Sequence, residues 1–149
     1  MKKRILECSS AGDARFSAFY AEVEIFGVTA SIEEHYQLSK RFLDKGRIVA
    51  PESMDSAKGL RPYEFVVRGI PYKTEYLTAW FTYLWIKFLD SNPKLVKVLK
   101  QYDDYSDMFK GRKTINCQAD VIRRYMHEGR ESLIQEYGGF FDAIETNQI

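Results

Sequence analysis

Three side chains that could act on a sugar lie close together after residue 31. Glu33 and Lys40 are seven residues apart, which is two helical turns, and Tyr36 lies between them. At about 100° per residue, helical geometry would place the carboxylate and the amine on one stripe, beside a buried face centred on Ile32. A carboxylate, an amine and a phenol would then share one wall, which suits electrostatic, acid–base or nucleophilic chemistry on a small substrate.

Each of these residues also has an ordinary structural explanation. Ser31 and Glu34 have the spacing of a capping box, with Ser31 as N-cap and Glu34 at position N3. Glu33 in the first turn is favoured by the helix dipole, and the Lys40 stem could cover apolar surface while its amine stays in water. Periodicity alone therefore leaves both a functional and a structural role open for Glu33 and Lys40.

Composition and motif spacing exclude several classes of function. The 149 residues include 22 Lys and Arg against 21 Asp and Glu, and a net charge of +1 is too small for a nonspecific nucleic-acid binder. The two His and two Cys are spread singly, so no zinc spacing exists and we expect neither a metal nor a cofactor. The sequence also contains no Gly-rich phosphate loop and no nucleophile elbow.

The apolar segments bear on location. The basic start of the chain is followed by Glu7 and two serines instead of the apolar run that a secretion signal requires. The apolar segment Tyr72–Asp90 is interrupted by Glu75 and Lys87, and a bilayer would need roughly 20 apolar residues. We therefore expect a cytoplasmic protein that does not bind a membrane.

These side chains must be positioned by helices and strands. The sequence pattern predicts one α+β domain over residues 1–149, mostly helical with a small amino-terminal β element. Residues 16–20 and 23–26 have the pattern of strands around a turn, and Tyr63–Val67 is a strand or an irregular apolar stretch. A short helix is expected before Leu60. Longer helices are predicted over Ile32–Lys45, Tyr72–Asp90, Pro93–Tyr102, Cys117–Glu128 and Glu131–Phe141, with an acidic loop at Tyr102–Phe109.

Aromatic residues make up 15% of the chain, and twelve of them lie between Tyr63 and Phe109. An aromatic-rich core accounts for most of this content, but Tyr and Trp also suit the wall of a pocket for a flat or sugar-like ligand. We expect Glu33 and Lys40 to open onto a cleft bordered by residues of the Tyr72–Asp90 helix.

Ten residues from Ser31 to Lys40 resemble the signature of the NADAR (YbiA-like) family, reading S-I-E-E-H-Y-Q-L-S-K where the family has S-V-E-H-x-Y-Q-x-x-K. The resemblance covers roughly residues 14–132. Family elements recur in order at Phe16–Phe19, Gly27, Ala57-Lys58, Lys87-Phe88, Asn92-Pro93, Asp107 and Asn116. Departures occur at Ala18, Glu34 and Tyr72, where the family has asparagine, histidine and tryptophan.

The resemblance implies a YbiA-like fold and an N-glycosidase that hydrolyses a ribose carbon–nitrogen bond. Its substrate would be ADP-ribose on a nucleobase, guanine in particular, of nucleic acid, or a ribosylamino-pyrimidine intermediate of riboflavin synthesis. The catalytic residues would be Glu33, Lys40 and Asp107. The substrate would contact Phe19, Tyr36, Lys58, Tyr72, Trp80 and Asn116.

Glu33 would stabilise the positive charge that develops on the sugar, or activate water. Lys40 would hold a phosphate, or attack the ring-opened sugar as a neutral amine to give an imine. A nearby carboxylate raises the pKa of a lysine and burial lowers it, and the sequence leaves open which effect is larger.

Two further functions fit the sequence. The departures at Tyr72 and Glu34 favour a module that binds ADP-ribose or a nucleotide without cleaving it, and the aromatic content alone fits a structural or protein-interaction domain. For the glycosidase and for the binding module alike, the small net charge predicts that ligand binding depends only modestly on salt, unless Lys58, Arg61 and Arg68 cluster.

Overall fold

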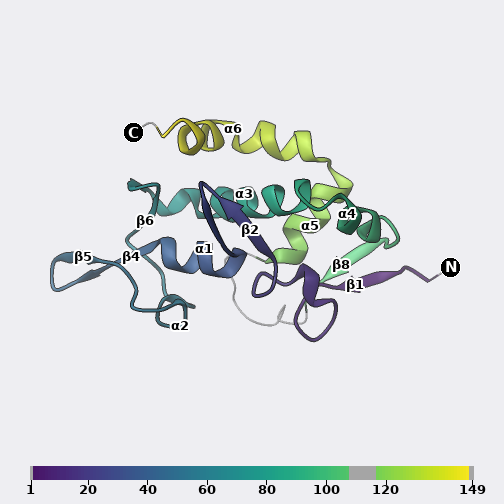
Figure 1. Cartoon of the computed structure of the whole chain (residues 1–149), viewed down its shortest axis with the longest axis horizontal. Coiled ribbons are helices and arrows are strands. Elements are labelled where there is room, and N and C mark those ends of the chain that lie inside the picture. The colour runs from purple at the N-terminus through teal and green to yellow at the C-terminus, as the bar shows by residue number, and fades with distance from the viewer. Residues whose placement is uncertain (1, 108–116, 148–149) are drawn as a thin grey trace.

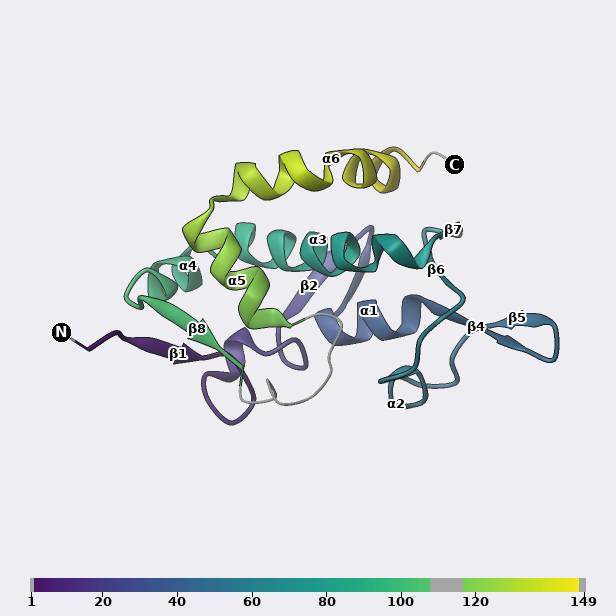
Figure 2. The same ribbon diagram turned by 180° about the vertical axis from the view of Figure 1, so that it is seen from behind.

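The computed structural model describes residues 2–107 and 117–147 and has an α+β fold built around one buried helix (Figure 1). This central helix, α3 (Leu77–Asp90), lies between α6 (Arg130–Thr146) and α1 (Ile32–Ser39) in both ribbon views (Figures 1 and 2). Eleven of its 14 residues are buried, because apolar side chains occupy nearly every position around the helix. The predicted α+β class is confirmed.

Three β-hairpins have the same kind of two-residue turn. They are formed by β2 (Glu22–Ile25) with β3 (Val28–Ser31), by β4 (Lys40–Asp44) with β5 (Arg47–Val49), and by β6 (Glu64–Val67) with β7 (Ile70–Tyr72). Each turn consists of two residues with positive φ: Phe26 and Gly27, Lys45 and Gly46, and Arg68 and Gly69. A type I′ turn requires positive φ at both positions, and glycine at the second position adopts it without steric cost.

The second and third hairpins join into one antiparallel sheet with the order β5-β4-β6-β7. Its register places Lys40 opposite Phe65, and Phe65 opposite Tyr72. Residues that pair directly in an antiparallel sheet project from the same face, so these three side chains form a row across the sheet. A separate parallel pair joins β1 (Ile5–Glu7) to β8 (Asp104–Ser106).

The first helix is shorter than predicted. Ser31 caps it as expected, since its hydroxyl accepts a hydrogen bond from the Glu34 amide at 3.0 Å. The predicted extension to Lys45 is wrong, because the helix ends at Ser39 and residues 40–49 form the β4–β5 hairpin. Gly46 therefore belongs to a hairpin turn and is not a helix stop.

Other bounds differ from the prediction because strands form where loops or helices were expected. α3 begins at Leu77 and not at Tyr72, since residues 70–72 pair with β6. The strand predicted at residues 16–20 is wrong, because a 3₁₀ turn ends at Phe16, and the predicted acidic loop contains β8. The remaining helical elements are α2 (Met54–Ala57), α4 (Pro93–Leu99), α5 (Gln118–His127) and 3₁₀ turns at Ala14–Phe16 and Thr74–Tyr76.

Within the described residues, no helix is both long enough and apolar enough to cross a membrane.

Phe65 joins the sheet to the carboxy-terminal helix. Its side chain is fully buried, and its ring lies 5.8 Å from Tyr72 and 6.0 Å from Phe140 of α6, measured between centroids. We expect Phe65→Ala to lower the free energy of unfolding by about 3–5 kcal/mol, because it removes buried apolar surface and leaves a cavity. Urea denaturation measures this loss. Tyr20→Ala, at a side chain that is 61% exposed, serves as the control and should change stability by about 0.5 kcal/mol at most. Equal losses for the two variants would contradict this assignment of the core.

Candidate active site

Glu33 lies in the first turn of α1 with its side chain buried in the protein. Its backbone N–H donates a hydrogen bond to the carbonyl oxygen of Ala18 at 2.9 Å. The amide Nε2 of Gln37, one turn later, donates to Glu33 Oε1 at 2.9 Å. The carboxylate is therefore held at the amino-terminal end of a helix, where the helix dipole favours a negative charge.

Lys40 reaches the same region from a strand. The prediction that it lies on the helical stripe of Glu33 is wrong, because Lys40 is the C-cap of α1, has extended backbone geometry and begins β4. Its side chain is only 4% exposed. The amine Nζ lies 3.4 Å from the carbonyl oxygen of Ala57, 3.3 Å from that of Leu60 and 5.3 Å from the centre of the Tyr36 ring.

Burial and charge act on the Lys40 amine in opposite directions. Loss of contact with water lowers the pKa of Lys40, while the nearby Glu33 carboxylate raises it. The burial effect is the larger, so the pKa of Lys40 lies below the ordinary value for lysine. A larger fraction of this amine is consequently neutral near physiological pH than is usual for lysine.

The central helix fixes the end of α1, from which Lys40 follows. Trp80 of α3 is buried, and its indole Nε1 donates a hydrogen bond to Ser39 Oγ at 3.1 Å. Ser39 in turn donates to the carbonyl oxygen of Tyr36 at 2.7 Å, and the Tyr36 ring packs edge-on against Phe81. Sequence reasoning missed Gln37 and Ser39, although both lie inside the Ser31–Lys40 motif.

Two further predicted binding residues contact each other. The Lys58 amine lies 4.3 Å from the centre of the Phe19 ring, a cation–π geometry, and both side chains are exposed. Lys58 is the C-cap of α2, and the preceding Ala57 supplies a carbonyl oxygen to Lys40. An exposed ammonium group and an aromatic face therefore border the segment that holds the buried amine.

Asp107 directly follows β8 and is buried. Its Oδ2 lies 3.8 Å from the Sγ atom of Cys117. Asn116, the last predicted binding residue, lies outside the described residues.

Gln118 connects this region with the start of α1. Its Nε2 donates to the carbonyl oxygen of Cys8 at 2.6 Å, and its Oε1 accepts from the amide of Ala18 at 3.0 Å. The carbonyl oxygen of Ala18 accepts from the amide of Glu33. The start of α5 and the end of β1 are thereby tied to the turn that carries Glu33, a link between distant segments that no local sequence pattern indicates.

Tyr72 packs toward the carboxy-terminal helix. Its ring lies 5.8 Å from Phe65 and 5.3 Å from Phe140, and burial raises the pKa of its hydroxyl. Among the described residues, none forms a hydrogen bond with that hydroxyl.

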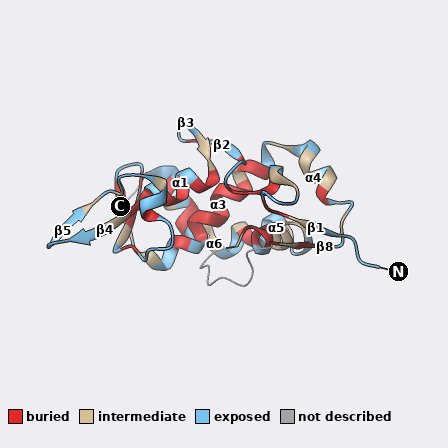
Figure 3. Ribbon diagram, turned by 90° about the horizontal axis from the view of Figure 1, so that it is seen from below, coloured by how far each residue is buried: buried red, intermediate tan, exposed pale blue. Residues whose placement is uncertain are grey.

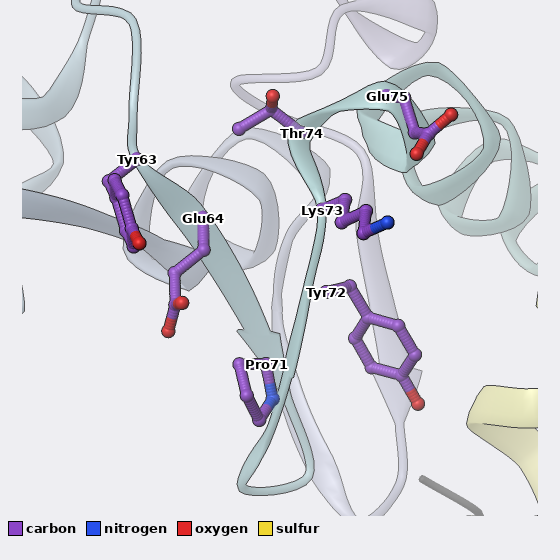
Figure 4. A pocket seen from close by; sticks show the side chains of 7 residues that line it. All are labelled: Tyr63, Glu64, Pro71, Tyr72, Lys73, Thr74 and Glu75. Carbon is purple, nitrogen blue, oxygen red and sulfur yellow. The ribbon is translucent and has the colours of Figure 1, made fainter.

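A pocket of about 510 Å³ lies at this end of the sheet (Figure 4), and Glu33 and Lys40 do not line it. It is lined by Tyr63, Glu64, Pro71, Tyr72, Lys73, Thr74 and Glu75. The expected cleft shared by Glu33, Lys40 and the Tyr72–Asp90 segment is not this pocket.

Within the described residues, no group of three His, Cys, Asp or Glu side chains is placed to hold a metal ion.

A family model described as “DarT1-associated NADAR antitoxin” matches residues 1–148 of the chain. A search of curated proteins finds no match. The family match thus extends well beyond the Ser31–Lys40 motif, to nearly the whole sequence.

Proposed function

The chain belongs to the family of DarT1-associated NADAR antitoxins, and from this membership we propose that it is an N-glycosidase that removes ADP-ribose from a guanine base of nucleic acid. The observation that carries the proposal is the buried Lys40 amine, whose pKa is lowered by burial although a buried carboxylate, Glu33, acts on it. Removal of the modification restores the base, and this outcome fits the description of the family as antitoxins.

Burial argues for catalysis over binding alone. Placing a carboxylate and an amine out of water costs free energy, which a simple binding surface does not need to spend. A reaction that develops charge benefits from such a site, because electrostatic interactions are stronger there than in water.

Glu33 supplies the negative charge that stabilises the transition state. Cleavage of the bond between ribose C1 and nitrogen builds positive charge on the sugar, and a carboxylate held next to that carbon stabilises it. Gln37 fixes the direction of the carboxylate through its hydrogen bond to Oε1. Asp107, the second buried carboxylate of the predicted set, is a further candidate for proton transfer.

Lys40 acts as the nucleophile on the ring-opened sugar. When the ring opens, the bond from C1 to the ring oxygen breaks, a proton moves from the base nitrogen to that oxygen, and C1 becomes an imine of the base nitrogen. The neutral Lys40 amine adds to C1 and opens this double bond, the bond from C1 to the base nitrogen then breaks, and the base leaves as a neutral amine with a proton from the added nitrogen. The resulting imine between Lys40 and the sugar is hydrolysed by water, which returns the free amine and gives the sugar aldehyde. Lowering of the lysine pKa by burial supports this role, since only the neutral amine is nucleophilic.

The exposed pair of Lys58 and Phe19 suits recognition of the rest of the ligand. An ammonium group pairs with the diphosphate of ADP-ribose, and an aromatic face stacks on a sugar or an adenine ring. Tyr36 and Trp80 line and support the wall between Glu33 and Lys40.

A panel of four substrates tests the reaction and its specificity. The protein is incubated with DNA carrying ADP-ribosyl-guanine, DNA carrying ADP-ribosyl-thymidine, an ADP-ribosylated protein and a ribosylamino-pyrimidine phosphate, and products are identified by mass spectrometry. We expect free ADP-ribose from the guanine substrate at a rate well above those for the other three. Binding of ADP-ribose without release from any substrate would instead identify a non-catalytic module.

A further inference from the structure

The β4–β5 hairpin extends from one end of the molecule, beyond the body of the protein (Figures 1 and 3). Leu43 and Ile48 are 56% and 51% exposed, and Lys45 and Arg47 are exposed as well. We call these four residues the hairpin surface. Because they contribute little to the core, packing within the chain does not explain why two large aliphatic side chains are exposed there.

The hairpin surface combines an apolar pair with exposed positive charge. Leu43 and Ile48 pair directly across the two strands and therefore project from one face. Because side chains alternate along a strand, this face is opposite to the one from which Lys40 projects. Residues 40–49 include four basic residues against one acidic residue, Asp44, in a chain with a net charge of only +1. In the described part of the chain, no salt bridge within 4.0 Å involves Lys45 or Arg47, and Asp44 is the residue directly opposite Arg47 in the hairpin. By contrast, carboxylates pair with Arg15, Arg123, Arg124 and Arg130.

Strand β4 links the hairpin surface to the candidate active site. β4 begins at Lys40, whose amine is buried, and runs outward to the turn at Lys45. Five residues of strand span about 17 Å, which corresponds to a few nucleotides of a nucleic-acid strand. A substrate whose sugar reaches Lys40 would therefore have its flanking nucleotides within range of this surface.

We propose that the hairpin surface binds the nucleic-acid strand that flanks the modified base, an inference that rests on the proposed function. Lys45 and Arg47 contact backbone phosphates, and Leu43 and Ile48 pack against the sugars and bases of the neighbouring nucleotides. The diphosphate of ADP-ribose is attached to the same ribose that must reach Lys40. The turn, about 17 Å away, is placed for the phosphates of the strand and not for that diphosphate.

Paired charge variants test this assignment. Lys45→Asn with Arg47→Gln removes two charges from the hairpin, and asparagine tolerates the positive φ of residue 45. Lys94→Gln with Lys97→Gln removes two exposed charges from α4 and is the matched control. Wild type and both variants are assayed for kcat/KM on a single-stranded oligonucleotide containing ADP-ribosyl-guanine and on ADP-ribosyl-guanosine. Binding of an unmodified labelled oligonucleotide is measured by fluorescence anisotropy.

We expect the hairpin charge variant to lose about tenfold in kcat/KM on the oligonucleotide and nothing on the nucleoside, with the control unchanged on both. For two phosphates of a single strand, the slope of log affinity against log salt should also become shallower by about 1.4. Leu43→Ser with Ile48→Thr should weaken oligonucleotide binding without changing that slope. A slope change of this size agrees with the modest salt dependence predicted from the net charge. Arg68 lies apart from the hairpin surface, where its guanidinium donates hydrogen bonds to the carbonyl oxygens of Ile144 and Glu145 near the end of α6.

The outcomes separate this inference from the proposed function. If the hairpin charge variant has the same kcat/KM as wild type on the oligonucleotide and on the nucleoside, the inference is overturned and the proposed glycosidase activity is unaffected. Wild type that cleaves neither substrate overturns the glycosidase, and the anisotropy arm then decides the inference by whether binding depends on the hairpin charges. A dimer in analytical ultracentrifugation that Leu43→Ser with Ile48→Thr abolishes, together with unchanged oligonucleotide binding, would assign the surface to a second copy of the chain and overturn the inference.

Discussion

Glu33→Gln is expected to lower turnover by a factor on the order of a hundred or more while leaving ADP-ribose binding nearly unchanged. Glutamine keeps an oxygen that can accept the hydrogen bond from Gln37, but it carries no charge to stabilise the cationic sugar. Single-turnover rates on ADP-ribosyl-guanine DNA measure the chemical step, and calorimetry with ADP-ribose measures binding. Thermal denaturation confirms that the variant is folded.

The matched control is Glu34→Gln, which changes the neighbouring carboxylate. Glu34 is exposed, and Ser31 caps the helix by accepting a hydrogen bond from the backbone amide of Glu34, which the substitution retains. Its effect on stability should therefore stay within about 0.5 kcal/mol, with the rate unchanged. A wild-type rate for Glu33→Gln, or greater damage from Glu34→Gln, would show that the wrong carboxylate has been assigned.

Lys40→Met is expected to abolish turnover without loss of stability. Methionine keeps a long apolar stem but supplies no nucleophile, so the rate should fall by a factor on the order of a hundred or more. Because its pKa is lowered by burial, Lys40 binds its proton more weakly in the folded than in the unfolded chain, so the charged lysine opposes folding below its unfolded pKa. Methionine removes this cost, and the free energy of unfolding at neutral pH should be equal or higher. Lys94→Met, at an exposed lysine of α4, is the control for rate.

Two measurements isolate the role of the Lys40 amine. Reduction with borohydride during turnover should attach the sugar covalently to wild-type protein at Lys40 and leave Lys40→Met unlabelled. The single-turnover rate should rise with pH through the lowered pKa of Lys40 and level off above it, because the neutral form is the reactive one. Turnover that Lys40→Met retains, with no trapped adduct on wild type, would exclude the amine as nucleophile.

Local signals in the sequence predicted the part of the fold around α1 and α3. The Ser31 cap set the start of α1, and the apolar residues between Leu77 and Asp90 indicated a buried helix. The sequence pattern did not predict the strand after Ser39, because Leu43 continues the helical apolar face of Ile32 and Tyr36. The hairpin depends on a Lys45-Gly46 turn and on pairing with β6, which is a tertiary contact.

The candidate site was predictable in composition and not in geometry. The motif from Ser31 to Lys40 identified Glu33 and Lys40, but helical spacing gave the wrong path for the lysine, which approaches from β4. The balance between burial and the Glu33 charge on the Lys40 pKa depends on how closely α2 and the residues that follow it cover the amine, through Ala57 and Leu60. The link from Gln118 to Ala18 joins residues 100 positions apart, and periodicity carries no information on such contacts.

The proposed reaction is tested most directly by identifying which bond is broken in a single-stranded oligonucleotide with one ADP-ribosyl-guanine. The substrate contains three kinds of ribose-type carbon–nitrogen bond: from ADP-ribose to the guanine base, from adenine to its ribose within ADP-ribose, and from the guanine base to the strand. Mass spectra of the oligonucleotide before and after incubation distinguish them. We expect free ADP-ribose and an intact strand with unmodified guanine, in a reaction that Glu33→Gln and Lys40→Met do not perform. An abasic strand, or an oligonucleotide that is bound but unchanged, would contradict it.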